Sequence, residues 1–219
     1  MNYEEEAAFA RSAGMLAGLL SRGFLRPGVA LAEEVRSGAF ARAVGEVVAW
    51  EEPAIAGALE GIERCGADLR ELEPDGARLA LEVDYNRLFV GPGSLLAPPY
   101  ESYYASARAG GGAGRLRTDD ERAVVRAYRA QGFCMPDAFV DLPDHVAVEL
   151  DFLAQLARRE AICWDIGNTA SAERLQQAQE AFRREHLGAW VGDFAALVAA
   201  GARTSFYPAL AVLAQTLFG

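Results

Sequence analysis

The chain has 219 residues, of which 52% are hydrophobic and 24% charged, a composition that is typical of a folded globular protein and excludes a long disordered one. Its 31 acidic and 21 basic residues give a formal net charge of −10, which argues against general nucleic-acid binding because phosphate neutralisation needs a surplus of Lys and Arg. An acidic surface instead favours a basic partner.

The cysteines and the beginning of the chain indicate where the protein works. Cys65, Cys134 and Cys163 are odd in number and form no Cys-x-x-Cys pair, so we expect free thiols in a reducing compartment. The first six residues contain no basic region followed by an apolar run, so a signal peptide is not predicted. The longest apolar stretch, 207–218, is too short to cross a bilayer. We therefore expect a cytoplasmic protein.

Helical periodicity runs along almost the whole chain, and no stretch has the alternating pattern of a strand. The first helix is predicted from Glu5 to about Arg22, where Gly23 ends it. Gly66 is expected to end the fourth helix, and Gly91-Pro92-Gly93 the fifth. The helices that follow the first in this half of the chain are predicted over 30–36, 39–50, 53–65 and 75–90.

The second half of the chain begins with Pro98-Pro99, which predicts an extended loop presenting Tyr100, Tyr103 and Tyr104. Thr118 is predicted to cap a helix that closes at Gly132. Further helices are predicted over 143–163, 171–186 and, as two helices broken near 201–204, over 187–218. About ten helices with short connections indicate an all-α fold, a compact helical bundle forming one domain over 1–219, with a possible hinge at about 132–143.

Catalytic signatures are missing from the sequence. The two histidines, His145 and His186, lie on different predicted helices, which excludes His-rich metal sites and the His-Glu-x-x-His motif. The glycine run 110–114 lacks the Gly-Lys-Ser/Thr ending of a phosphate-binding loop, and no Gly-x-Ser-x-Gly elbow occurs. We therefore predict a protein that is not an enzyme and holds no metal or cofactor.

Two segments carry patterns that suggest binding. In the first, Tyr85 to Tyr104, a helix brings Leu88 and Phe89 to a Gly-Pro stop, and a proline-stiffened loop then presents Tyr100. Aromatic side chains on a rigid loop give a large contact area at little entropic cost, which favours a peptide-binding surface. The alternative is that these residues pack in the core, as helix-spaced apolar residues such as Leu88 and Phe89 usually do.

The second segment, 142–150, places His145 and Glu149 one turn apart on the apolar side of a predicted helix. Two buried polar side chains are expected to pair with each other or with the neighbouring loop, either as a structural pair or as a recognition corner. Asp144 is expected on the opposite, exposed side, where it is available to a cationic group.

These segments resemble the TorD/DmsD family of redox-enzyme maturation chaperones. The resemblance rests on Tyr85-x-x-Leu-Phe-x-Gly-Pro followed by Pro-Pro-Tyr100, on Asp144-His145, and on Glu185-His186-Leu187 with Trp190. It implies an all-helical fold, in some members a domain-swapped dimer, and binding of the twin-arginine leader of a molybdopterin-containing subunit until its cofactor is inserted. Two departures from the family pattern are Pro143 directly before Asp144 and Gly93 after Gly-Pro.

Carried over to this chain, the resemblance nominates a leader-binding groove. Apolar leader residues are expected beside the groove side chains, and Asp144 together with Glu101 is expected to meet the arginines by charge-assisted hydrogen bonds. The nominated residues are Tyr85, Leu88, Phe89, Tyr100, Glu101, Asp144 and His145.

Three alternatives remain open at this point. A chaperone of the NarJ type serves a nitrate reductase subunit that carries a remnant of a leader. A helical enzyme or small-molecule binder would use His145 and Glu149 as an acid–base pair. A structural oligomer subunit would bury the Tyr100 loop in a symmetric interface.

Overall fold

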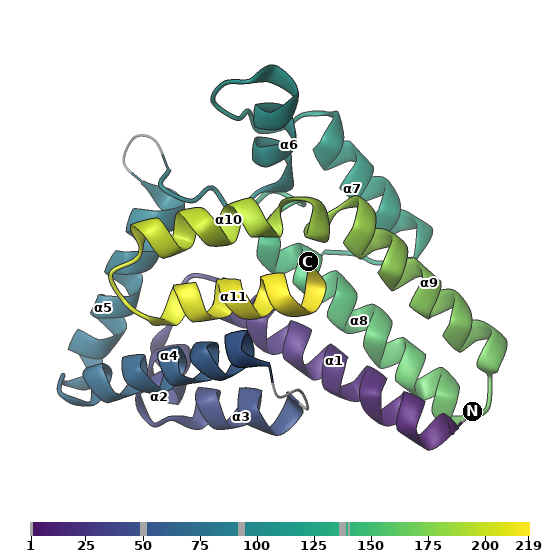
Figure 1. Cartoon of the computed structure of the whole chain (residues 1–219), viewed down its shortest axis with the longest axis horizontal. Coiled ribbons are helices and arrows are strands. Elements are labelled where there is room, and N and C mark those ends of the chain that lie inside the picture. The colour runs from purple at the N-terminus through teal and green to yellow at the C-terminus, as the bar shows by residue number, and fades with distance from the viewer. Residues whose placement is uncertain (1, 49–51, 92–94, 136–138, 140) are drawn as a thin grey trace. The chain divides into compact units, whose positions relative to one another are not determined.

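The computed structural model describes residues 2–48, 52–91, 95–135, 139 and 141–219 (Figure 1). These ranges hold eleven α-helices, one π-helix and no β-strand, and an isolated bridge joins Tyr100 to His145. The all-α fold class is therefore confirmed. The helices are α1 (Tyr3–Gly23), α2 (Val29–Arg36), α3 (Ala39–Val47), α4 (Pro53–Arg70), α5 (Pro74–Tyr85), the π-helix η1 (Asn86–Val90), α6 (Glu101–Gly110), α7 (Asp119–Ala130), α8 (Val146–Asp165), α9 (Thr169–Glu185), α10 (Leu187–Gly201) and α11 (Phe206–Phe218).

The chain divides into two compact units, each assembled from separate stretches. Unit 1 comprises the residues up to Ser21 together with Tyr100–Trp190, and unit 2 comprises Arg22–Pro99 together with Val191–Gly219. The stretch 132–143 lies inside unit 1, and its residues 136–138 and 140 are outside the described part. A hinge at this stretch and a single domain over the whole chain both stay predictions.

Unit 2 is built around α4, which packs against α2 and α11 (Figure 1). The prediction that Gly66 ends this helix is wrong, since α4 continues to Arg70. A Cβ atom at Gly66 would lie 2.5 Å from the main-chain oxygen of Val35, closer than side chains are found to backbone. The glycine therefore serves the close approach of α2 rather than a helix stop.

Asp84 of α5 holds the turn between α10 and α11, also within unit 2. Its carboxylate accepts hydrogen bonds from the amides of Arg203 (2.9 Å) and Thr204 (2.7 Å) and from the Thr204 hydroxyl (2.8 Å). The side chain of Asp84 is almost fully buried, so these donors compensate a charge that has lost its water. One carboxylate thus fixes the start of the last helix, where Pro208 lies in the first turn as predicted.

Unit 1 is built on α8, which lies beside α9. Trp164 near the end of α8 stacks on Tyr3 of α1, with ring centroids 5.7 Å apart. Its indole N–H donates to Glu160 at 3.0 Å, and the second carboxylate oxygen of Glu160 accepts from Gln179 of α9 at 2.7 Å. A buried acid thereby joins the two helices while both of its oxygens are bonded.

Helix starts differ from the predictions in three places. The segment predicted as an extended loop after Pro98-Pro99 contains α6, and only Tyr100, its N-cap, is extended. Helix α8 starts at Val146 rather than Pro143, because His145 is its N-cap. Helix α9 is capped by Asn168, whose side chain accepts from the amide of Ser171, the residue that was predicted to be the cap. The Thr118 cap of α7 is confirmed.

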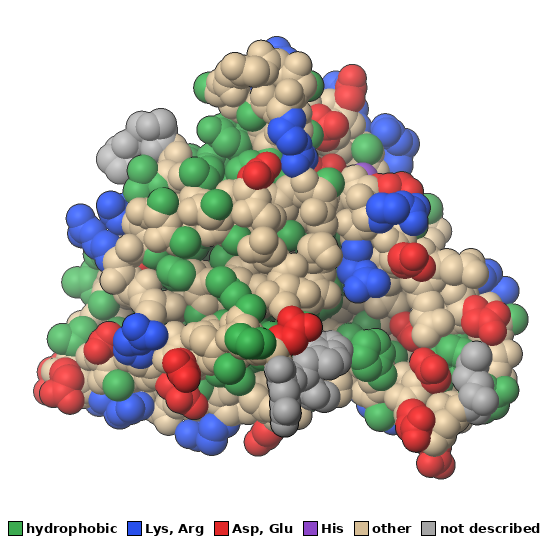
Figure 2. Space-filling model, viewed as in Figure 1, with side chains coloured by type: hydrophobic (Ala, Val, Ile, Leu, Met, Phe, Trp, Pro, Cys, Tyr) green, Lys and Arg blue, Asp and Glu red, His purple; other side chains and the backbone are tan. Residues whose placement is uncertain are grey.

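Charged side chains are interspersed on the face drawn in Figure 2. Arginine and acidic side chains alternate there instead of gathering into one patch of a single sign. Within the described residues, none of the helices combines the length and the apolar character needed to cross a membrane.

Replacing Asp84 with alanine is expected to destabilise unit 2 by roughly 3 kcal/mol, because three donors lose a charged acceptor in a buried place. Urea unfolding followed by circular dichroism measures this change. The matched control is Asp68→Ala, which removes an exposed acid on α4 and should alter the free energy of unfolding by less than about 0.5 kcal/mol. Equal effects of the two substitutions would contradict the anchoring role of Asp84.

Candidate functional site

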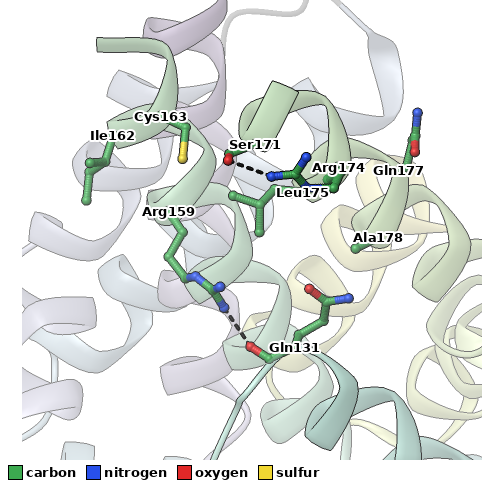
Figure 3. A pocket seen from close by; sticks show the side chains of 9 residues that line it. All are labelled: Gln131, Arg159, Ile162, Cys163, Ser171, Arg174, Leu175, Gln177 and Ala178. Atoms are coloured by element: carbon green, nitrogen blue, oxygen red, sulfur yellow. Dashed lines mark hydrogen bonds between the residues drawn. The ribbon is translucent and has the colours of Figure 1, made fainter. Parts of the chain in front are cut away.

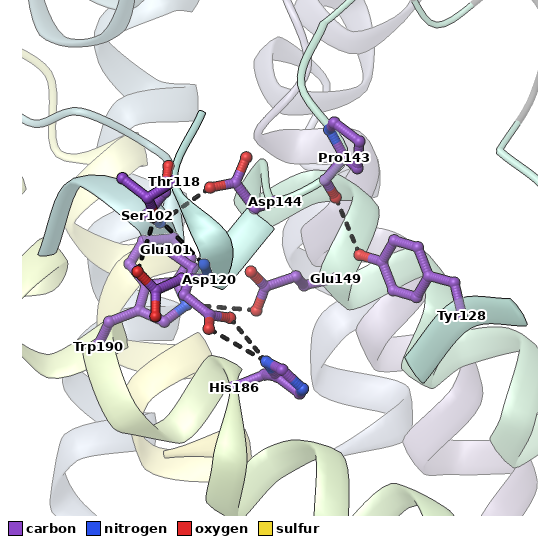
Figure 4. A network of polar contacts seen from close by, with 10 residues as sticks. All are labelled: Glu101, Ser102, Thr118, Asp120, Tyr128, Pro143, Asp144, Glu149, His186 and Trp190. Atoms are coloured by element: carbon purple, nitrogen blue, oxygen red, sulfur yellow. Dashed lines mark hydrogen bonds and ion pairs between the residues drawn. The ribbon is translucent and has the colours of Figure 1, made fainter. Parts of the chain in front are cut away.

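Asp144, in the chain just before α8, caps the first turn of α6 (Figure 4). Its carboxylate oxygen Oδ2 accepts from the amide of Ser102 at 2.8 Å, and its main-chain oxygen accepts from the amide of Glu101 at 3.0 Å. These amides belong to the helix start, where no partner within the helix is available. A carboxylate at this end also interacts favourably with the helix dipole. Asp144 thus stabilises a helix that is distant in sequence.

His145 caps its own helix, α8. Its Nδ1 accepts from the amide of Ala147 at 3.0 Å, so this nitrogen carries no proton and the imidazole is neutral. The ring also meets Tyr100 edge-on at 5.4 Å and Phe139 at 5.8 Å. Burial lowers the pKa of His145 to about 4, in agreement with a neutral ring. The Asp144-His145 pair therefore starts two helices at once.

Glu101, in the first turn of α6, faces His186 at the end of α9. Both carboxylate oxygens lie 3.1 Å from His186 Nδ1, and both side chains are buried. Burial raises the pKa of Glu101, and the hydrogen bond and charge of His186 oppose that rise. This contact joins α6 to the α9–α10 corner.

Glu149, on the first turn of α8, points at Trp190. Its Oε2 accepts from the indole N–H at 3.2 Å, and the Trp190 ring stacks on Tyr104 with centroids 5.2 Å apart. The side chain of Glu149 is 0% exposed. Burial raises its pKa well above the ordinary value of 4.5, and the charges of Glu101 and Asp144 add to the rise. We call the carboxyl groups of Glu101, Asp144 and Glu149, together with His186 and Trp190, the buried network.

Two predictions about this corner are wrong. Asp144 was expected to be exposed, yet it is 0% exposed, because capping α6 places it inside unit 1. His145 and Glu149 were expected on the inward side of the helix, paired with each other or with the neighbouring loop. Both are buried, but their side chains bond to Ala147 and Trp190 instead. His145 is an N-cap outside the regular helix, so the spacing of one turn does not apply to it. The acid–base pair of the enzyme alternative is not formed.

The other nominated residues are also buried. The Tyr100 hydroxyl donates to Asp141 at 3.0 Å within unit 1, and Tyr100 is buried in the single chain without any partner subunit. In unit 2, Tyr85 and Phe89 belong to an aromatic cluster in which Phe89 meets Tyr207 at 5.4 Å, and Leu88 is fully buried. The core interpretation, which the sequence left open for Leu88 and Phe89, therefore describes them.

The exposed face of α5 and η1 was missed at the sequence level. Leu79 and Val83, one turn apart, are 52% and 45% exposed, and Val90 at the end of η1 is 56% exposed. Leu72, 42% exposed, precedes α5. We call these four residues the apolar stripe. In the sequence, the apolar stripe can be recognised as a second series of apolar residues along α5, in addition to the buried series that includes Leu81 and Tyr85. One buried helix face does not require this second series.

Acidic residues surround the beginning of the apolar stripe. Glu71, Glu73 and Asp75, which we call the acidic corner, are exposed in the connection from α4 and the first turn of α5. An exposed acidic end followed by an exposed apolar face is complementary to a segment with basic residues before an apolar stretch. The described residues contain no group of three or more ligands that could hold a metal ion.

Comparison with known proteins identifies the family. The profile of the nitrate reductase delta subunit family matches residues 53–196, more than half of the chain. The chain therefore belongs to this family. Its resemblance to the TorD/DmsD chaperones is confirmed by the relatives described next.

Among the curated relatives, the chaperone protein TorD of Vibrio cholerae is 31% identical over 119 residues, 54% of this chain and 50% of that protein. TorD of Shewanella loihica is 27% identical over 147 residues, 67% of this chain and 63% of that protein. The chlorate reductase assembly chaperone protein of Ideonella dechloratans is 29% identical over 148 residues, 66% of this chain and 72% of that protein. The chain thus spans between half and two thirds of the length of these TorD relatives. All three of these relatives carry the names of chaperones.

Glu149→Gln is expected to stabilise the protein increasingly as the pH rises above about 4.5. The folded-state pKa of Glu149 is raised, so the folded protein holds a proton that the unfolded chain releases above its ordinary pKa of 4.5. The parent therefore loses stability as the pH rises toward the folded-state pKa. Glutamine does not titrate and keeps an oxygen for Trp190, so the variant avoids this loss.

Urea unfolding of parent and Glu149→Gln between pH 4.5 and 8 measures the difference. Glu180→Gln, an exposed acid on α9, is the control and should follow the parent at every pH. A constant difference between parent and Glu149→Gln over this range would show that Glu149 is ionised in the folded protein.

Substitutions at His145 separate its capping role from its packing. Asparagine is a good N-cap and alanine a poor one, so His145→Ala should cost about 1 kcal/mol more than His145→Asn at pH 7. Both variants should also lose less stability than the parent as the pH falls from 6.5 toward 4, because the lowered pKa of His145 makes the parent lose stability there. Thermal unfolding over this pH range tests both points, and equal stability of the two variants would contradict the cap.

Proposed function

We propose that this protein is a cytoplasmic chaperone that binds the twin-arginine leader and the immature form of a molybdopterin-containing oxidoreductase subunit, and delays export until the cofactor is inserted. Membership of the family and the chaperone names of its relatives support this proposal. The name of one relative refers to assembly of chlorate reductase, an oxidoreductase.

The observation that carries the leader assignment is the acidic corner followed by the apolar stripe. A leader with paired arginines before an apolar helix has the same order, a charged end followed by an apolar stretch, with charge of the opposite sign. The arginines would meet Glu71, Glu73 and Asp75 through charge-assisted hydrogen bonds, and the apolar part would cover Leu79 and Val83. From Asp75 to Val90 is about 22 Å at 1.5 Å per residue, roughly the length of four helical turns of a bound leader.

This assignment moves the contact surface away from the residues that the family resemblance nominated. Asp144 and His145 are bonded inside unit 1, and Leu88 and Phe89 are core residues of unit 2. Substituting any of them would disturb the fold and thereby lower leader binding indirectly. We assign them to the framework, and we assign direct contact to the acidic corner and the apolar stripe.

The second candidate function is a NarJ-type chaperone, and the family description favours it as a specific alternative. Its client would carry a leader remnant without the need for paired arginines. Recognition would then depend on the apolar stripe alone, with the acidic corner contributing little. The two candidates therefore differ in how strongly binding depends on the arginines of the leader.

Leu79→Gln with Val83→Gln should weaken binding of a fluorescent twin-arginine leader peptide at least tenfold. Each substitution removes an apolar side chain that would be buried on binding, worth about 1 kcal/mol or more. Fluorescence anisotropy measures the affinity. The matched control is Met15→Gln with Ile166→Gln, which replaces two apolar side chains elsewhere that are at least as exposed, and it should leave the affinity unchanged.

A second peptide, with both leader arginines replaced by glutamine, separates the two candidate functions. The twin-arginine proposal predicts loss of at least tenfold in affinity and a weaker salt dependence. Unchanged affinity for this peptide would favour the NarJ-type alternative. Equal binding of the leader by the parent and the Leu79→Gln, Val83→Gln variant would overturn the assigned surface.

A further inference from the structure

A cavity of about 670 Å³ lies in unit 1, between α8 and α9 (Figure 3). Leu175 and Ala178 of α9 and Ile162 of α8 contribute apolar side chains to its lining. Arg159 and Arg174 stand on opposite sides of it, one on each helix. None of these residues belongs to the buried network, the acidic corner or the apolar stripe.

A second hollow of about 340 Å³ continues the first. The two share Gln131 and Arg159 in their walls, and the second adds Phe133, Phe152 and Leu156. Along α8 the lining residues run from Phe152 to Cys163, which is roughly 16 Å of helix. We treat the two hollows together as one groove with a mixed polar and apolar lining, which we call the α8–α9 groove.

The charge in this groove is positive and uncompensated. The two hollows are lined by Arg159 and Arg174 and by no acidic residue. Arg159 donates to the main-chain oxygen of Gln131 at 2.8 Å, and Arg174 donates to the Ser171 hydroxyl at 2.8 Å. Within the described part of the chain, neither guanidinium forms an ion pair with a carboxylate. In a protein with 31 acidic and 21 basic residues, such a pair of arginines is a local reversal of charge.

We propose that the α8–α9 groove binds an acidic, partly apolar peptide segment of a partner protein. Arginine presents a planar fork of donors that matches a carboxylate, and both arginines retain donors beyond the single hydrogen bond each one makes. Apolar side chains of the segment bury against Leu175, Ile162 and Phe133, while its carboxylates meet Arg159 and Arg174.

The dimensions of the groove favour a peptide over a single small anion. Its lining extends well past the two arginines to Phe152 and Phe133, and Gln131 and Gln177 in the lining carry amide groups that a peptide backbone can bond. The site also has the opposite charge preference to the acidic corner. A basic leader and an acidic segment would therefore occupy different surfaces, and binding of the acidic segment in the groove does not depend on leader binding.

Selection from a random library of 12-residue displayed peptides tests the proposal without knowledge of the partner. The full-length chain is immobilised and compared with the variant that carries Arg159→Gln and Arg174→Gln. Peptides that bind the parent and are lost on the variant should be rich in Asp and Glu beside Leu or Phe. Synthetic copies should bind the variant about tenfold more weakly, as expected for the loss of two ion pairs, and the parent more weakly as salt rises.

Arg183→Gln is the matched control, since Arg183 is an exposed arginine on the same helix outside the groove. This variant should retain every selected peptide. Basic peptides that the parent selects should persist on the groove variant and disappear on the Leu79→Gln, Val83→Gln variant, which separates the two surfaces. If no selected peptide is lost on the groove variant, or if the lost peptides carry no net negative charge, the proposal is overturned.

Discussion

The adjacent residues Asp144 and His145 hold the starts of two helices, and much of unit 1 depends on them. Asp144 satisfies the amides of Glu101 and Ser102 at the start of α6, and His145 satisfies that of Ala147 in α8. A helix start leaves amides without partners inside the helix, so a buried start needs an acceptor from elsewhere. Once α6 is fixed in this way, Glu101 is directed at His186 and Tyr104 at Trp190.

This arrangement separates the framework of the protein from its recognition surfaces. The buried network joins α6, α8 and the α9–α10 corner through three carboxyl groups whose pKa values burial raises. Groups so enclosed hold helices in place and are out of reach of a partner. The acidic corner, the apolar stripe and the α8–α9 groove are exposed, so they are the surfaces to which we assign partners.

Local sequence patterns predicted the helical fold well, because helical hydrophobic periodicity and capping residues such as Thr118 depend only on neighbouring residues. These patterns predicted the local structure wrongly where a contact with a segment distant in sequence determines it. The start of α6 depends on Asp144, more than 40 residues away. The need for glycine at position 66 follows only from the close approach of Val35 in α2. The buried state of Asp144 follows from the same distant contact. Neighbouring residues alone predicted a loop, a helix stop and an exposed acid at these places.

We propose that the Asp144-His145 corner supports the fold while the acidic corner and apolar stripe contact the leader. Hydrogen–deuterium exchange of the full chain, with and without a saturating twin-arginine leader peptide, tests it most directly. We predict slower exchange over residues 71–90 on leader binding, with unchanged exchange over 101–104 and 144–149. Slower exchange confined to 144–149, with none over 71–90, would contradict the claim and return the leader to the Asp-His corner.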